Sequence, residues 1–212
     1  MSKLHEYLKN QESIITSAVE GKTLLDFVDR NANEYPDHPA LNSPANAEYS
    51  AWDSISWSEY RETSKNLAAG LMTLGLGPGD TAFIMSNNTK EHNIADLGIV
   101  YSGATPSTLY KQLKYSQIEY VANLMEAKVA VVGDLELFEE VNKAKKDCIN
   151  LNAIVLIDGY EEKKDLDYVY SYHELIEKGK SINSEDTSKL DSAIATVTPD
   201  SLACLIFTSG TT

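Results

Sequence analysis

Short apolar segments alternate along the chain with longer segments that carry apolar residues at helical spacing. Residues 81–85 (TAFIM), 128–133 (KVAVVG) and 153–157 are apolar runs with the length of strands buried on both faces of a sheet. Helical spacing lies between these runs, for example over residues 91–101 and 135–145. Strands that alternate with helices indicate βαβ units, so we predict an α/β fold with a mostly parallel sheet.

The amino-terminal residues follow a different pattern. Residues 1–22 are polar with weak periodicity, and we expect them to form a loosely ordered extension. Periodic apolar positions begin at residue 23, with a predicted helix that ends before Pro36. We therefore predict an extension over residues 1–22 and a domain over residues 23–212.

Serine residues mark the expected starts of three helices. Ser58 is the expected N-cap of one helix, because its hydroxyl can accept a hydrogen bond from a free amide of the first turn. Capping boxes, in which a serine is followed three residues later by a glutamate, begin at Ser116 and Ser171. The box at Ser116 predicts a helix over residues 117–127, and the box at Ser171 predicts a short helix.

The end of the sequence combines an apolar strand with a hydroxyl-rich loop. Residues 181–199 have no apolar period and are expected to form a polar linker, whereas residues 202–207 are expected to form a final strand. That strand leads directly into five small residues: Thr208, Ser209, Gly210, Thr211 and Thr212. Hydroxyl groups donate hydrogen bonds to phosphate oxygens, and a glycine lets backbone N–H groups approach without an intervening Cβ. The loop predicts a phosphate-binding site, with an ordinary polar loop as the alternative.

Two other motifs with related chemistry do not fit this loop. A Walker loop requires GxxxxGK[ST], and the sequence contains no glycine five residues before a Gly-Lys pair. A nucleophile elbow requires GxSxG, but Phe207 stands where the first glycine would precede Ser209.

Charge and cysteine content narrow the possible partners. The formal net charge of −14 argues against nucleic acid or an anionic membrane as the main partner, because both require a basic surface. Cys148 and Cys204 fit neither a metal-ligand spacing nor a CxxC pair, which is typical of a reducing compartment. No apolar run approaches the ~18 residues of a membrane span, and residues 1–22 lack the pattern of a secretory signal. We expect a cytoplasmic protein without a transmembrane segment.

Histidines and acidic runs give no further candidate site. The four histidines are isolated from one another and are expected to have surface or capping roles rather than to bind a metal: His5, His38, His92 and His173. The acidic run 161–167 carries interspersed lysines and the run 134–140 has helical spacing, so both are expected to form solvated surfaces. We therefore predict no metal site in this chain.

The final loop resembles the phosphate-loop signature of the adenylate-forming (AMP-binding) superfamily, commonly written [YF]TSGTTGxPKG. The chain contains the first part of that signature, FTSGTT, at residues 207–212. Similarity continues upstream in matching order, in residues 38–41 (HPAL), 55–60 (ISWSEY), 75–88 (GLGPGDTAFIMSNN) and 103–106 (GATP). The resemblance covers roughly residues 23–212 and implies part of the N-terminal large domain of an acyl-CoA synthetase-like fold.

Within this superfamily the chain looks most like bacterial long-chain fatty acid–CoA ligases. Tyr110, followed by residues 117–120 (QIEY) and 126–129 (EAKV), carries this similarity. Residues 111–116 (KQLKYS) depart from it, because they replace a Ser/Pro-rich turn that is common in the long-chain branch. A short-chain, aryl or amino-acid-activating member is the alternative within the superfamily.

The resemblance implies a two-step reaction. A carboxylate attacks the α-phosphate of ATP to give an acyl-adenylate and pyrophosphate, and the thiolate of coenzyme A then displaces AMP. The implied cofactors are ATP, Mg²⁺ and coenzyme A, and the implied substrate is a fatty acid. Thr208, Ser209 and Thr211 would donate hydroxyl hydrogen bonds to the ATP phosphates, Gly210 would allow close backbone approach, and Thr212 would complete the loop.

Other groups that the family uses in catalysis follow this loop in longer members. We therefore expect the 212 residues to be an amino-terminal fragment that has no complete set of catalytic residues and is inactive alone. A non-catalytic α/β binding module is the alternative from a different functional class. Because a long-chain substrate partitions into membranes, the resemblance leaves peripheral membrane contact open.

Overall fold

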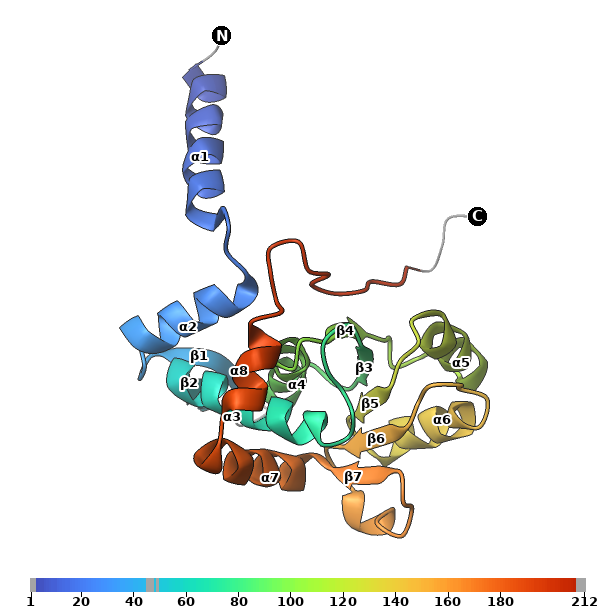
Figure 1. Cartoon of the computed structure of the whole chain (residues 1–212). Helices are drawn as coiled ribbons and strands as arrows, with labels where there is room; N and C mark the ends of the chain where they lie inside the picture. The colour runs from blue at the N-terminus through green and yellow to red at the C-terminus, as the bar shows by residue number, and fades with distance from the viewer. Residues whose placement is uncertain (1–2, 45–47, 49, 209–212) are drawn as a thin grey trace.

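The computed structural model describes residues 3–44, 48 and 50–208, and its centre is a parallel sheet of five strands in the order β4-β3-β5-β6-β7 (Figure 1). The strands are β3 (Thr81–Met85), β4 (Thr105–Thr108), β5 (Val129–Val132), β6 (Ala153–Leu156) and β7 (Val169–Ser171). Every pairing between neighbours in this sheet is parallel. The predicted α/β fold is therefore confirmed.

The central strands are buried on both faces because their side chains alternate between two apolar cores. In β3, Phe83 and Met85 belong to one core, and Ala82 and Ile84 belong to the other. Helices cover each face, as the βαβ pattern requires (Figure 1). The first core packs under α5 (Tyr115–Leu124) and α6 (Leu135–Lys145), and the second under α3 (Trp57–Met72), α4 (Lys90–Tyr101) and α7 (Tyr172–Glu185).

An outer layer lies on α3 and α4. It consists of α2 (Leu24–Glu34) and α8 (Ser188–Ile194), which bury Leu25, Val28 and Leu190 against the outer side of these helices. The predicted linker over residues 181–199 is wrong, because α7 continues to Glu185 and α8 follows it. A helix of seven residues with few apolar positions is too short to show a periodic signal in the sequence.

The amino-terminal segment forms a helix, α1 (Lys3–Val19), that extends away from the rest of the chain (Figure 1). A regular helix thus stands where the polar sequence predicted a loosely ordered extension. Among its side chains that the structure describes, Tyr7, Leu8 and Ile15 are solvent-exposed. Within the part of the chain that the structure describes, no helix has the length and apolar character needed to cross a bilayer.

Two of the three predicted helix caps lie at other residues in the structure. Ser56 caps α3, because its hydroxyl accepts a hydrogen bond from the amide of Glu59 at 3.2 Å while the Glu59 carboxylate accepts from the amide of Ser56 at 2.8 Å. The prediction of Ser58 was therefore wrong by two residues, because the box begins where the hairpin of β1 (Pro39–Pro44) and β2 (Trp52–Ser56) ends.

The helix predicted from the box at Ser116 begins earlier than expected. Lys114 occupies the N-cap position of α5, and its amide donates to the side-chain oxygen of Gln117 at 3.1 Å, so Ser116 lies inside the helix. The cap at Ser171 is confirmed, since its hydroxyl accepts from the amide of Glu174 at 3.3 Å. Residues 158–168, which precede β7, include a short 3-10 helix, η1 (Tyr160–Glu162).

The predicted strand over residues 202–207 is reduced to a single parallel bridge between Leu205 and Ser107 of β4. Leu205 and Phe207 pack against the core under α5 and α6, whereas Ile206 is 80% exposed. The alternation of a strand is present, but only one side of this segment has a partner among the described residues.

Candidate functional site

The structure places the start of the predicted phosphate loop at the carboxyl edge of the sheet. The bridge at Leu205 is parallel to β4, so the chain runs in the direction of that strand and brings Thr208 to the same cavity as Thr108. Open parallel sheets bind ligands at this edge. Of the five predicted site residues the structure describes Thr208. The other four lie outside the described residues: Ser209, Gly210, Thr211 and Thr212.

Thr208 lines a cavity of about 440 Å³, which we call the carboxyl-edge cavity. Its walls are the end of β4 and the loop that follows it, the first turns of α5, and the segment that leads to Thr208. The lining residues are Thr108, Leu109, Tyr110, Leu113, Ser116, Gln117, Tyr120, Val121, Phe207 and Thr208. Apolar side chains and rings dominate, with hydroxyl and amide groups among them, so the cavity suits an apolar group that carries a polar end.

Sequence reasoning singled out Tyr110 and Phe207 for their resemblance to the family, but it did not bring them together in one cavity. Tyr110 is 69% exposed and comes two residues after β4, whereas Phe207 reaches the cavity through the bridge at Leu205. Tyr120 was also part of that resemblance, in residues 117–120, whereas Leu113 lies in the stretch that departs from it. An aromatic residue soon after a buried strand is the sequence signal that could have identified the loop after β4.

A second, polar hollow of about 540 Å³ lies at the carboxyl edge where the strand order reverses between β3 and β5. Lysines and carboxylates line it together, including Lys111, Lys114, Asp134 and Glu136. Asp134 serves a structural purpose there, because its carboxylate caps α6 by accepting from the amide of Leu137 at 3.0 Å. The mixed charges give this hollow no preference for a cation or an anion.

A histidine lies behind the carboxyl-edge cavity. His92, in the first turn of α4, has its Nδ1 2.8 Å from Ser86 Oγ and its Nε2 3.2 Å from Thr108 Oγ1. Burial lowers the pKa of His92, and burial raises the pKa of Asp96 one turn further along the helix. The sequence predicted a surface or capping role for His92, so this bridge between two strand ends was missed.

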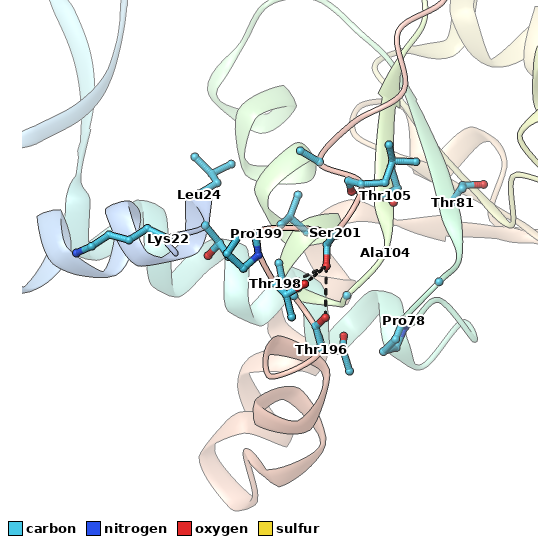
Figure 2. A pocket seen from close by; sticks show the side chains of 17 residues that line it. Lys22, Leu24, Pro78, Thr81, Ala104, Thr105, Thr196, Thr198, Pro199 and Ser201 are labelled. Atoms are coloured by element: carbon cyan, nitrogen blue, oxygen red, sulfur yellow. Dashed lines mark hydrogen bonds between the residues drawn. The ribbon is translucent and has the colours of Figure 1, made fainter. Parts of the chain in front are cut away.

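A further cavity, of about 490 Å³, opens at the opposite edge of the sheet, by the first residues of β3 and β4 (Figure 2). Its hydroxyl groups are engaged in holding the carboxyl-terminal segment. Ser201 Oγ accepts from the amide of Thr198 at 2.9 Å and donates to the carbonyl oxygen of Thr196 at 3.4 Å. Thr105 Oγ1 donates to the carbonyl oxygen of Leu202 at 3.2 Å. These contacts give the cavity a structural role.

Among the described residues, no group of three or more His, Cys, Asp or Glu side chains could hold a metal ion. The residues described at the carboxyl edge offer hydroxyl groups and apolar side chains, with the half-buried imidazole of His92 behind them.

Comparison with known proteins gives the family. The sequence pattern of the AMP-binding enzyme family matches residues 28–212. The chain is 31% identical over 161 residues to the long-chain-fatty-acid–CoA ligase ACSBG1 of Rattus norvegicus, covering 76% of this chain and 22% of that protein. It is 29% identical over 191 residues to ACSBG2 of Xenopus laevis, covering 90% of this chain and 25% of that protein.

Solved structures agree at the level of the fold. The crystal structure of the anthranilate CoA ligase AuaEII in complex with anthranoyl-AMP superposes with a TM-score of 0.63 at 20% identity, over 74% of this chain and 27% of that one. The chain thus spans about a quarter of the length of each of these three proteins. The family pattern covers the whole sheet and the segment that leads to Thr208, and this chain belongs to the AMP-binding enzyme family of adenylate-forming ligases.

Proposed function

We propose that this chain forms the ATP phosphate-binding part of an acid–thiol ligase, which activates a fatty acid as an acyl-adenylate and transfers it to coenzyme A. The observation that carries the proposal is the position of Thr208. The bridge between Leu205 and Ser107 directs the chain toward the carboxyl edge of a parallel sheet, where such folds bind their ligands. The TSGTT sequence begins at that point.

In this function the loop acts by placing donors before the reaction starts. Thr208, Ser209 and Thr211 would donate hydroxyl hydrogen bonds to the β- and γ-phosphates of the substrate Mg-ATP, and Gly210 and Thr212 would offer backbone N–H groups. Charge moves onto the phosphate oxygens as pyrophosphate leaves, so donors fixed in advance stabilise the transition state. The described residues that hold Thr208 in place are Leu205 and Phe207, through the bridge and the core contact.

We propose a long-chain fatty acid as the substrate. Support comes from the names of the relatives at about 30% identity and from the apolar character of the carboxyl-edge cavity. Tyr110, Leu113 and Phe207 would contact the apolar part of the acid there. A small aromatic acid is the competing substrate, since the structurally similar AuaEII is an anthranilate CoA ligase.

The experiment is acid-dependent exchange of labelled pyrophosphate into ATP, measured on an active protein that contains this chain. Replacing Thr208→Val keeps the shape of the side chain and removes its hydroxyl, and we expect exchange to fall about tenfold or more. Thr198→Val is the matched control, because Thr198 is an exposed threonine at the opposite edge of the sheet. Equal exchange by the two variants would contradict the proposed role of Thr208.

The same assay decides the class of acid. We expect palmitate to support exchange and thioester formation with coenzyme A more efficiently than anthranilate or acetate does. A preference for anthranilate would contradict the long-chain fatty acid as substrate, but it would still support an acid–thiol ligase. Failure of every acid to support exchange would reject the ligase itself.

A further inference from the structure

His92 joins the carboxyl ends of two neighbouring strands through both nitrogens of its ring. Ser86, which contacts Nδ1, is the residue after β3, and Thr108, which contacts Nε2, is the last residue of β4. β3 and β4 are parallel neighbours, with Ile84 opposite Thr108. The imidazole therefore spans the edge of the sheet at the point where both chains leave it.

The direction of each hydrogen bond follows from the single proton of the Ser86 hydroxyl. Ser86 Oγ lies 3.1 Å from the carbonyl oxygen of Asn87 and donates to it, so the same oxygen accepts from Nδ1–H of His92. Nε2 then carries the lone pair that accepts the hydroxyl proton of Thr108. This is the hydrogen-bonding pattern of the neutral ring protonated at Nδ1, and burial favours the neutral ring by lowering the pKa of His92.

The ring holds a wall of the carboxyl-edge cavity. Thr108 begins that wall, which continues through Leu109 and Tyr110 to Leu113. The amide of Leu109 still pairs with the carbonyl oxygen of Ile84 at 2.8 Å, as the last backbone contact with β3. Beyond it, side chains tie the two loops together: Thr108 to His92, and the ammonium of Lys111 to the side-chain oxygen of Asn87.

A hydrolytic triad does not account for this cluster, although a serine, a histidine and an aspartate occur together. Both ring nitrogens of His92 are engaged by hydroxyl groups, so neither is available for the carboxylate of Asp96. A triad requires a carboxylate on one nitrogen and the nucleophile on the other. The geometry is that of a bridge between two loops.

We propose that His92 is a positioning residue whose neutral imidazole holds the wall formed by residues 108–113 of the carboxyl-edge cavity. This role rests on the proposed function, because it assumes that the carboxyl-edge cavity is the ligand site. The bridge itself is tested without any ligand.

The first test is amide hydrogen exchange in the 212-residue chain. His92→Phe removes both hydrogen bonds, His92→Asn keeps a donor near Ser86, and His92→Gln keeps a partner near Thr108. We expect exchange at Leu109–Leu113 to rise about tenfold in the Phe variant, with β5 unchanged, because the loop loses its ties while the core is kept. The Gln variant should restore most of the protection and the Asn variant less. Asn93→Ala, an exposed neighbour on the same turn, is the control.

A second measurement on the unmodified chain keeps the proposal testable if the variants fail to fold. The ¹⁵N chemical shifts of the His92 ring at neutral pH should show the Nδ1–H tautomer. An Nε2–H tautomer, or exchange at Leu109–Leu113 that is equal in the Phe variant and the unmodified chain, would overturn the bridge. So would a rise in exchange that is uniform over the sheet.

A third experiment distinguishes a failure of the proposed His92 bridge from a failure of the proposed function. Titration with the fluorescent fatty acid cis-parinaric acid should show weaker binding to His92→Phe than to the unmodified chain, with partial recovery in His92→Gln. Equal binding by all variants would overturn the positioning role. If the unmodified chain does not bind this probe, the assignment of the cavity to a fatty acid fails, while the tautomer and the exchange data still decide the bridge.

Discussion

The amide nitrogen of Leu205 donates a hydrogen bond to the carbonyl oxygen of Pro106 at 3.0 Å, which joins the carboxyl-terminal segment to the edge of the sheet. Pro106 lies in β4, about a hundred residues earlier in the chain. This pairing gives the segment its direction. The packing of Leu205 and Phe207 under α5 determines which of its side chains face the core. The position of Thr208 at the carboxyl-edge cavity depends on both.

Leu205→Pro tests this relationship, because proline has no backbone N–H to donate to Pro106. We expect the segment over residues 202–208 to leave the edge of the sheet and to become sensitive to limited proteolysis, while α1 to α8 keep their circular dichroism signal. Ile206→Pro is a demanding control, because Ile206 is exposed and its amide is absent from the pairing with β4. Equal cleavage of both variants would show that the hydrogen bond of Leu205 does not hold the segment.

Two glycines allow α3 and α7 to pack with their backbones in contact. A Cβ on Gly179 would lie 1.8 Å from the carbonyl oxygen of Asn66, and a Cβ on Gly70 would lie 2.3 Å from the carbonyl oxygen of Leu175. We expect Gly179→Ala to lower the free energy of unfolding by about 3 kcal/mol, since backbone atoms cannot move aside as side chains do. Urea unfolding of the 212-residue chain measures this loss.

Gly77→Ala is the matched control for the helix contact. A Cβ at this position would meet no heavy atom within 4 Å, and its φ is outside the left-handed region. We expect a change within about 1 kcal/mol of zero, of either sign. A similar loss in both alanine variants would show that the close approach of the two helices does not decide the effect.

The sequence predicted the sheet well because the signal of a doubly buried strand is local. Residues 82–85, 129–132 and 153–157 are apolar at consecutive positions, and each run has the length of a strand. Short elements were not predicted. β7 has three residues and α8 has seven, so neither is long enough for a period to emerge from its composition.

The candidate site was predicted less completely than the fold. Thr208 was identified through its motif, which is contiguous in the sequence. Tyr110 and Phe207 meet at one cavity, and His92 contacts Thr108 of its wall, because strand order and a single parallel bridge bring distant segments together. Such long-range contacts leave no periodic trace in the sequence, so a lone histidine on a helix was given a surface role.

The first turn of α3 offers a test of the corrected cap. Ser56→Ala removes the hydroxyl that accepts from the amide of Glu59, and we expect it to lower the free energy of unfolding by about 1 kcal/mol. Ser58→Ala should change it by less than about 0.5 kcal/mol, because Ser58 lies inside the helix. Both values come from urea unfolding at neutral pH. A larger loss in the Ser58 variant than in the Ser56 variant would show that Ser58 caps the helix, as the sequence predicted.

Asp96 makes the stability of this fold depend on pH in the unusual direction for a carboxylate. Burial raises the pKa of Asp96, while the nearby His92 lowers it by a smaller amount. Between the pKa of an unfolded aspartate, about 3.9, and the higher pKa of Asp96 in the fold, the folded chain binds more protons than the unfolded chain. The contribution of Asp96 to the free energy of unfolding therefore falls as the pH rises through this window.

Asp96→Asn removes that dependence, because an amide does not ionise. We expect the variant to gain stability relative to the unmodified chain as the pH rises from about 4 to 7, since the unmodified chain alone must hold a buried carboxylate there. Asp186→Asn is the control with the opposite sign. Hydrogen bonds from the amide and hydroxyl of Ser188 lower the pKa of Asp186, so its contribution is present above the unfolded pKa and is lost as the pH falls. Urea unfolding from about pH 4 to 7 measures the effect of Asp96→Asn, and its extension to about pH 2 measures the control, because the contribution of Asp186 is lost only below the unfolded pKa of about 3.9. A stability difference for Asp96→Asn that stays constant from about pH 4 to 7 would show that the carboxylate keeps its ordinary pKa in the fold.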